Sequence, residues 1–168
     1  MQGSDLDRDA FVNQMTQFEL GMIVARNSFE QWVIRCSTAS GLVGYSPLEM
    51  LILHLIDYNT RPKRIADICF ALKIEDTHLV SYALKKLVKG KLVESTRQGK
   101  DTVFTNTKEA TRLVNEYRAV RKSILSRAFD SITKGTINLE EMADTMRAFA
   151  SIYEQAARTV EIQDYGSA

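Results

Sequence analysis

Apolar side chains recur along the first forty residues at alternating intervals of four and three positions. The stripe consists of Phe11, Met15, Phe18, Met22, Ala25, Phe29, Trp32 and Cys36. This spacing predicts one long helix from about Asp7 to Cys36 with a narrow, coiled-coil-like seam. A helix of this length exceeds what a small domain needs to close its own core. The seam therefore favours packing against a partner helix.

Gly41 and Gly44 interrupt this pattern, and three shorter helices are predicted after them. The first begins with Ser46 as its N-cap, Pro47 at the first helical position and Glu49 as the capping-box partner, and runs through Asp57. Its buried face is expected to hold Leu48, Leu51, Ile52, Leu55 and Ile56.

The next helix is predicted to open at Pro62 and to end near Leu72. Its inward positions are expected to be Ile65, Ala66, Ile68, Cys69 and Leu72. A further helix from Thr77 to Lys89 is expected, with Asp76 or Thr77 as its cap. Its inward positions are expected to be Val80, Ala83, Leu84, Leu87 and Val88.

The periodicity then changes, because "LVESTRQGKDTVFTNT" alternates and is rich in Val, Thr and Phe. It predicts a two-stranded hairpin around residues 97–100. After Thr107 a helix is expected to about Ile132, broken at Lys134-Gly135. A last helix, capped by Asn138, is predicted to carry the stripe Leu139, Met142, Met146, Phe149, Tyr153, Ala156 and Val160, and residues 161–168 are expected to fray.

These elements predict a mostly α (α+β) fold, in which three short helices and a hairpin form a winged helix-turn-helix domain. Long N- and C-terminal helices with apolar seams are expected to mediate dimerisation. The expected divisions are 1–44 for the N-terminal dimerisation helix and linker, 45–108 for the winged helix-turn-helix domain, and 109–168 for the C-terminal dimerisation helices.

The formal net charge of +1 hides an asymmetric distribution. Residues 60–122 contain 15 Lys/Arg and 7 Asp/Glu, whereas the rest of the chain contains 7 Lys/Arg and 14 Asp/Glu. A basic middle between acidic flanks indicates a module that binds a polyanion. A solvated lysine-rich surface is the alternative.

The remaining chemistry excludes most other classes of function. His54 and His78 are the only histidines, and the sequence contains no phosphate-binding glycine loop, nucleophile elbow or metal-ligand cluster. We therefore expect no enzyme activity, no metal and no cofactor. Cys36 and Cys69 lie far apart and are expected to be buried thiols in a reducing compartment. No signal peptide or apolar run of membrane-spanning length is present, which predicts a cytoplasmic protein without a membrane partner.

The order and spacing of these elements resemble the MarR family of bacterial transcription regulators across nearly the whole chain. The matching segments are "YSPLEMLILHLI", "KRIADICFAL", "VSYALKKLVKGKLVE" and "TNTKEA". The resemblance implies a homodimer that binds double-stranded DNA. Two departures stand out. Tyr82 occupies a position where the family usually has arginine, and "RQGKDTVF" lacks the double arginine of the family's wing.

The outward residues of segment 77–89 suit a helix that enters the major groove of DNA with its N-terminus first. Base-edge or nearby phosphate contacts are expected from Thr77, His78, Ser81 and Tyr82, and phosphate contacts from Lys85, Lys86, Lys89 and Lys91. Backbone contacts are expected from Arg61, Lys63 and Arg64, and minor-groove contacts from Arg97 and Lys100. The alternatives are a winged helix that binds a protein partner, and a protein that binds only small molecules.

The terminal seams supply the expected dimer interface, formed by Phe11, Phe18, Phe29, Met142, Met146, Phe149 and Tyr153. Packing within one subunit is the alternative. The family resemblance also implies a small, often phenolic effector between the dimer helices and the DNA-binding domain. Its expected lining is Trp32, Tyr45, His54 and Tyr117, for which ordinary core packing is the alternative.

Overall fold

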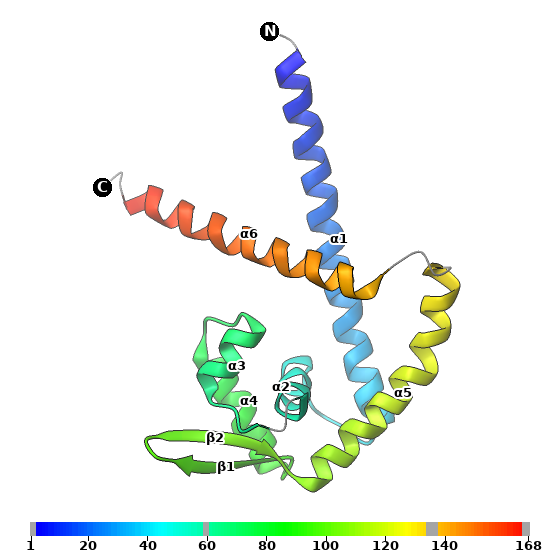
Figure 1. The fold of residues 1–168 in the computed structure, drawn as a ribbon, viewed down its shortest axis with the longest axis vertical. Coiled ribbons are helices and arrows are strands. Elements are labelled where there is room, and N and C mark those ends of the chain that lie inside the picture. Colours follow the sequence, from blue (N-terminus) through cyan, green and yellow to red (C-terminus); the bar gives the residue numbers. More distant parts are fainter. Residues whose placement is uncertain (1–2, 59–60, 134–137, 166–168) are drawn as a thin grey trace. The chain divides into compact units, whose positions relative to one another are not determined.

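The computed structural model describes residues 3–58, 61–133 and 138–165. The chain forms two compact units, Met1–Lys122 and Ser123–Ala168. Its elements are α1 (Gly3–Ala39), α2 (Pro47–Tyr58), α3 (Ile65–Leu72), α4 (Thr77–Lys89), β1 (Val93–Gln98), β2 (Asp101–Asn106), α5 (Lys108–Thr133) and α6 (Leu139–Tyr165) (Figure 1). The predicted mostly α fold with a two-stranded hairpin and long terminal helices is confirmed. The predicted divisions at 44/45 and 108/109 stay predictions.

The last turns of α1 enter the core of the first unit, where Val33 and Cys36 are buried. The helix begins four residues earlier and ends three residues later than predicted, and it stops before Gly41, whose φ of 88° is accessible to glycine at no steric cost. The Leu42 amide donates to the Ser37 carbonyl over 2.8 Å and closes the helix end.

The capping box of α2 is confirmed. The Ser46 amide donates to Glu49 Oε2 over 2.7 Å, and the Glu49 amide donates to Ser46 Oγ over 3.3 Å. Of the predicted inward residues, Ile52 and Ile56 are buried, while Leu48, Leu51 and Leu55 are half-buried. Met50 and Leu53, which the predicted face omitted, are completely buried.

The helix α3 begins at Ile65, three residues later than predicted. The backbone of Lys63 instead pairs with Phe104 of β2, which keeps the preceding residues extended. The prediction for Ala66 was also wrong, because Ala66 is exposed; Ile68 and Cys69 are buried.

The bounds of α4 match the prediction, and Asp76 is its cap, accepting from the His78 amide over 2.8 Å. Antiparallel strands β1 and β2 pair from Val93–Asn106 to Gln98–Asp101, so Gly99 and Lys100 form a two-residue turn. Gly99 has a φ of 63°, as such hairpin turns require. The predicted hairpin and its tip are confirmed.

Thr107 caps α5, since its Oγ1 accepts from the Ala110 amide over 3.1 Å. Asn138 caps α6, as predicted, by accepting from the amides of Glu140 and Glu141. The predicted fraying was wrong for residues 161–165, which are helical. The predicted break at Lys134-Gly135 and the end of the tail at 166–168 lie outside the described residues. None of the helices in the described ranges is long and apolar enough to cross a membrane.

A buried carboxylate connects α2 with α4. Glu49 is 4% exposed. Besides its capping bond, Oε2 accepts from Lys86 Nζ over 2.9 Å, and the same ammonium donates to the Gly44 carbonyl over 2.8 Å. Lys86 therefore fixes the loop before α2 and the start of α2 onto α4.

A second buried carboxylate connects α2 with the hairpin and α5. Asp57 accepts from Arg118 over 2.7 Å, from Asn106 Nδ2 over 3.3 Å and from Thr111 Oγ1 over 3.2 Å. Asp57 thereby holds the base of the hairpin on the C-terminal end of α2, whereas Lys86 binds the start of the same helix through Glu49.

His54 lies on α2 against Tyr117 of α5, with 4.3 Å between ring centroids. Burial is the main cause that lowers the pKa of His54 to about 4, and the positive charges of Arg118 and Arg121 add to it. Burial likewise raises the pKa of Tyr117. His54 is thus held neutral in the folded protein at neutral pH.

We predict that Lys86→Ala lowers the free energy of unfolding by about 2 kcal/mol, because it leaves the Glu49 carboxylate buried without its cation. The neighbouring Lys85→Ala is the matched control and should change stability by less than about 0.5 kcal/mol, since Lys85 is exposed. Urea unfolding followed by circular dichroism measures both. Equal effects would contradict the role of Lys86 as the cation that pairs with buried Glu49.

We also predict that stability falls as the pH is lowered from about 6.5 to about 4. In this window the unfolded state binds a proton at His54 that the folded state does not, so the loss reaches about 3 kcal/mol. Carboxylates also titrate in this pH window. The measured quantity is therefore the difference in the free energy of unfolding between wild type and His54→Gln at each pH. The exposed His78→Gln is the control, and it should keep the wild-type pH profile.

Candidate nucleic-acid interface

The outward face of α4 carries a ridge of four exposed side chains at intervals of four, three and four positions. They are His78, Tyr82, Lys85 and Lys89, here called the α4 ridge. On the opposite side, Val80, Ala83, Leu84 and Leu87 are buried in the core. One helix therefore anchors the domain with one face and presents basic and aromatic groups to solvent with the other.

The loop-side groove lies between the α4 ridge and the loop before α2. This cavity of about 610 Å³ is lined by Val43, Gly44, Tyr45, Tyr82, Lys85, Lys86, Lys89 and Gly90. The Lys86 ammonium lies 5.5 Å from the centre of the Tyr45 ring. A Cβ on Gly90 would lie 2.1 Å from the Tyr45 hydroxyl oxygen, so only glycine permits this close approach.

The wing-side groove lies between α4 and the hairpin. This cavity of about 250 Å³ is lined by Ser81, Leu84, Lys85, Val88, Ser95, Thr102 and Phe104. Lys85 borders both grooves, so the α4 ridge stands between them. A helix exposed in this way between two grooves has the form needed to enter the major groove of DNA.

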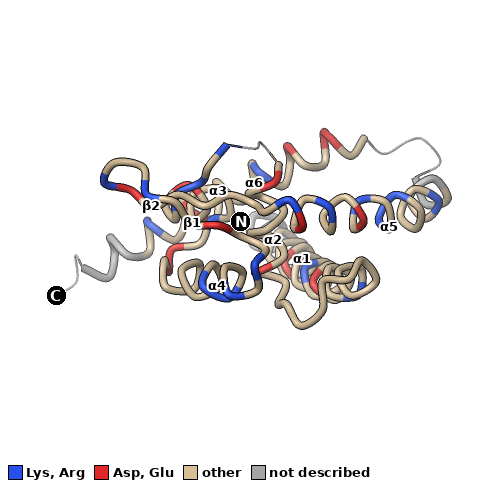
Figure 2. The backbone as a smooth tube through the Cα atoms, turned by 90° about the horizontal axis from the view of Figure 1, so that it is seen from below, with Lys and Arg blue, Asp and Glu red and all other residues tan. Residues whose placement is uncertain are grey.

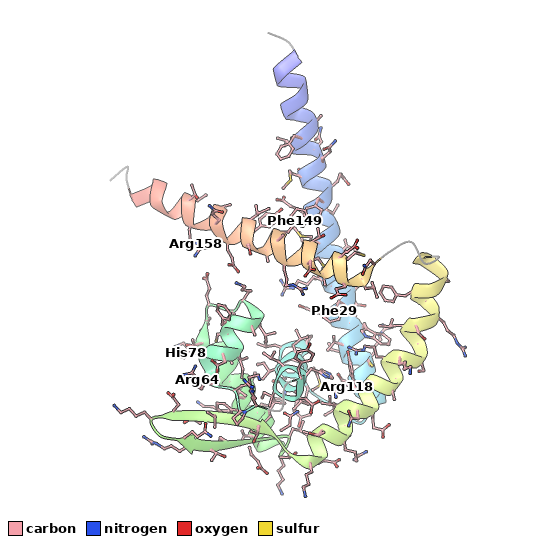
Figure 3. The ribbon with its side chains drawn as sticks, in the orientation of Figure 1. Phe29, Arg64, His78, Arg118, Phe149 and Arg158 are labelled. Carbon is pink, nitrogen blue, oxygen red and sulfur yellow. The ribbon has the colours of Figure 1, made fainter. Side chains whose placement is uncertain are left out.

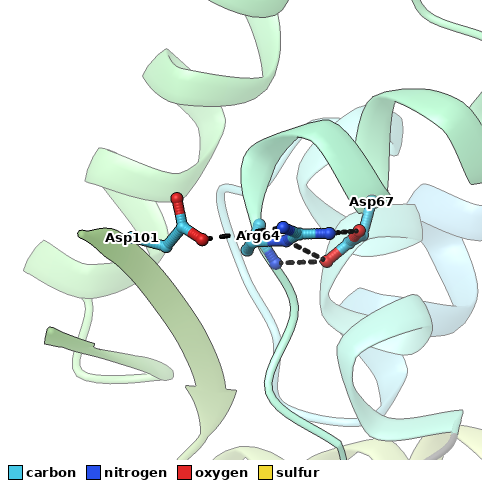
Figure 4. Close-up of polar contacts among 3 residues, drawn as sticks. All are labelled: Arg64, Asp67 and Asp101. Carbon is cyan, nitrogen blue, oxygen red and sulfur yellow. Dashed lines mark hydrogen bonds and ion pairs between the residues drawn. The ribbon is translucent and has the colours of Figure 1, made fainter. Parts of the chain in front are cut away.

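The predicted backbone-binding arginine at the start of α3 is part of a brace. Arg64 donates to both carboxylate oxygens of Asp67 at 3.0–3.1 Å, and its guanidinium lies 3.6 Å from Asp101 at the start of β2 (Figure 4). The hydrogen bonds from Arg64 lower the pKa of Asp67. Arg64 thus joins α3 to the hairpin, while Arg61 remains exposed and Lys63 is half-buried.

Positive charge also gathers at the hairpin tip, where Arg97 and Lys100 are exposed. Figure 2 shows Lys and Arg in blue along α4 and at this tip. The Arg97 Nε donates to the Gly99 carbonyl over 3.4 Å, which holds the side chain along the turn.

The structure brings His78, Tyr82 and Lys85 together on one ridge, with Thr77 exposed at the start of α4 and Ser81 half-buried toward the hairpin. His78 and Arg64 are labelled in Figure 3. The ammonium of Lys86, predicted to contact phosphate, is bonded to Glu49 and Gly44, and its contact with DNA stays a prediction. Sequence reasoning missed Leu79, which is 53% exposed. Its position one turn before Tyr82, outside the buried stripe, was the available signal.

The four residues predicted to line an effector site do not form one group. Tyr45 lies in the loop-side groove, whereas His54 stacks on Tyr117 at the junction of α2 and α5. Trp32 of α1 is half-buried beside Tyr117. Burial raises the pKa of the neighbouring Cys36 thiol.

The predicted dimer residues are partly exposed on each terminal helix. Phe11 and Phe29 of α1 are 61% and 50% exposed, and Met142 and Met146 of α6 are 42% and 63% exposed. Phe18, Phe149 and Tyr153 are half-buried. Figure 3 labels Phe29 on α1 and Phe149 on α6.

Residues 46–110 match a family model described as a winged helix DNA-binding domain. No curated protein sequence matches the chain. Among solved structures, the transcriptional regulator BldR from Sulfolobus solfataricus is 15% identical with a TM-score of 0.62, and the match covers 83% of this chain and 96% of that one.

A MarR-family transcriptional regulator from Rhodococcus sp. RHA1 is 18% identical with a TM-score of 0.62, covering 80% of this chain and 94% of that one. CouR from Rhodococcus jostii RHA1, bound to p-coumaroyl-CoA, is 18% identical with a TM-score of 0.61, covering 78% and 91%. BldR and the protein from Rhodococcus sp. RHA1 are described as transcriptional regulators, and at these identities the matches show a shared fold. The chain is a winged helix-turn-helix protein with the fold of the MarR-family transcriptional regulators.

Proposed function

We propose that the chain is a homodimeric, sequence-specific DNA-binding transcription regulator that acts in the cytoplasm. The observation that carries this proposal is the α4 ridge, a basic and aromatic surface on the helix that a winged helix-turn-helix places in the major groove. Lys85 and Lys89 supply phosphate contacts, and Arg97 and Lys100 at the hairpin tip supply a second set. The excess of positive charge in residues 60–122 supports the same function.

Homodimerisation is part of the proposal. A single winged helix covers one half-site, and two copies held about one DNA turn apart read a palindrome. Exposed apolar residues on α1 and on α6 favour burial against a second copy, because stripes of this length on solvent-facing helices are costly to leave in water.

A protein-binding winged helix is the second candidate. It is favoured by the exposure of Phe70 and Tyr82, which are 78% and 71% exposed on α3 and α4. It predicts negligible affinity for duplexes of any sequence and a partner whose binding requires Tyr82.

We predict that the purified protein enriches specific duplexes from a random pool, and that its affinity falls steeply with salt as phosphate contacts release counterions. Lys85→Ala and Lys89→Ala should each flatten the plot of log affinity against log salt by about one unit, because each variant removes one cation from the phosphate backbone. Arg147→Ala on α6 is the control and should keep the wild-type slope. Salt-insensitive binding, or no enriched duplex, would exclude DNA as the partner.

We further propose that a small aromatic effector binds near Trp32, His54 and Tyr117. The tilted pair of His54 and Tyr117 supports this site, because it combines an aromatic surface with polar atoms at the junction of α2 and α5, and Trp32 of α1 lies beside Tyr117. That CouR is bound to an aromatic acyl-CoA supports the class of ligand.

Salicylate, a phenolic carboxylate, is the probe for this site. We predict that it raises the melting temperature of the wild type and weakens duplex binding. Tyr117→Phe should reduce the thermal shift, while Tyr45→Phe in the loop-side groove should keep it. An unchanged melting temperature across phenolic carboxylates would remove the effector from the proposal.

A further inference from the structure

The N-terminal half of α4 exposes apolar surface where a reading helix meets base edges. Leu79 and Tyr82 are 53% and 71% exposed and lie three positions apart, so their side chains are neighbours on the helix surface. His78 and Thr77 complete the exposed set in these first two turns. Packing of the described core does not explain why Leu79 and Tyr82 face outward.

Apart from lysine, the side chains that most often read adenine, cytosine and guanine are absent from α4. Its sequence, THLVSYALKKLVK, contains no arginine, asparagine, glutamine, aspartate or glutamate. Asparagine and glutamine are the usual partners of adenine, acidic side chains of cytosine, and arginine or lysine of guanine. The lysines lie in the C-terminal half, and the ammonium of Lys86 is already bonded to Glu49.

Apolar side chains recognise one feature of the major groove, the C5-methyl group of thymine. We propose that Leu79 and Tyr82 form a reading surface for thymine methyl groups, so that the half-site bound by α4 contains thymines at the positions facing this pair. This inference rests on the proposed DNA-binding function and specifies the class of sequence that the same surface recognises.

In this proposal the two halves of α4 contact different parts of the DNA. The helix enters the groove N-terminus first, which brings Leu79 and Tyr82 to the bases and leaves Lys85 and Lys89 near the phosphates. The Tyr82 ring stands on the ridge between the two grooves, with the loop-side groove beside it. The ring therefore reaches a base edge without displacing a contact that the fold needs.

The test replaces thymine by uracil, which removes the methyl group and leaves the protein and the base pairing unchanged. A duplex is first selected with the full-length wild type from a random pool, and each thymine is then replaced singly. Affinity is expected to fall by about three- to fourfold at one or two positions in each half-site, as expected for one methyl group leaving an apolar contact. Replacements elsewhere should have no effect.

Protein variants then assign each position. Leu79→Ala and Tyr82→Ala should weaken binding to the thymine duplex and lose their effect on the uracil duplex. Tyr82→Phe keeps the ring and should retain the wild-type preference. His78→Gln, beside the pair, should retain the sensitivity to uracil.

Uniform tolerance of uracil at every position would overturn the inference while leaving DNA binding itself intact. So would a selected half-site of G·C pairs, or a Leu79→Ala/Tyr82→Ala variant that loses a protein partner and keeps its DNA affinity. Failure to enrich any duplex would instead refute the proposed function, because the salt series and the selection both depend on it.

Discussion

The buried carboxylate of Glu49 is the interaction on which the arrangement of the winged-helix domain depends. One oxygen, Oε2, accepts both the amide of Ser46 and the ammonium of Lys86, so a single side chain caps α2 and fixes α4 beside it. Breaking the pair from the lysine side leaves a charge that is 4% exposed without its cation. Because the same lysine also holds the Gly44 carbonyl, the loop that follows α1 is tied to the helix proposed to read DNA.

This constraint also decides which lysines of α4 are free for a ligand. Lys85 and Lys86 are adjacent in sequence and identical in chemistry, yet Lys86 stabilises the fold and Lys85 stands between two grooves. Arg64 shows the same division at the start of α3, where two carboxylates engage it and make it a brace between α3 and the hairpin. The net positive charge of the domain consequently overstates the number of cations available to phosphates. Exposed cations remain on the ridge, at the tip of the hairpin, and at Arg61 and Lys91.

Local patterns predicted the elements well because each depended on neighbours in sequence. The capping box at Ser46, the Asp76 cap and the turn at Gly99 all act within four residues, and all are present. The misplaced start of α3 and the role of Lys86 have another origin. Lys63 pairs with Phe104, and Lys86 pairs with a residue 37 positions away. Such partners leave no periodic signal in the chain. Tyr45 illustrates the same limit, since its hydroxyl fits against α4 only because residue 90 is glycine.

The distribution of groups along α4 separates affinity from specificity. Lysine contacts to phosphate are insensitive to sequence and weaken with salt, whereas the contacts proposed between base edges and Leu79 and Tyr82 would be apolar and change little with salt. In such a regulator, rising ionic strength weakens non-specific binding more than it weakens the discrimination between DNA sequences. Tyr82, at a position where the MarR family usually has arginine, would therefore change more than the preferred base under the proposed mode of reading. Part of the recognition would pass from a charged contact, which also attracts phosphates of any sequence, to one that gains only where a methyl group is present.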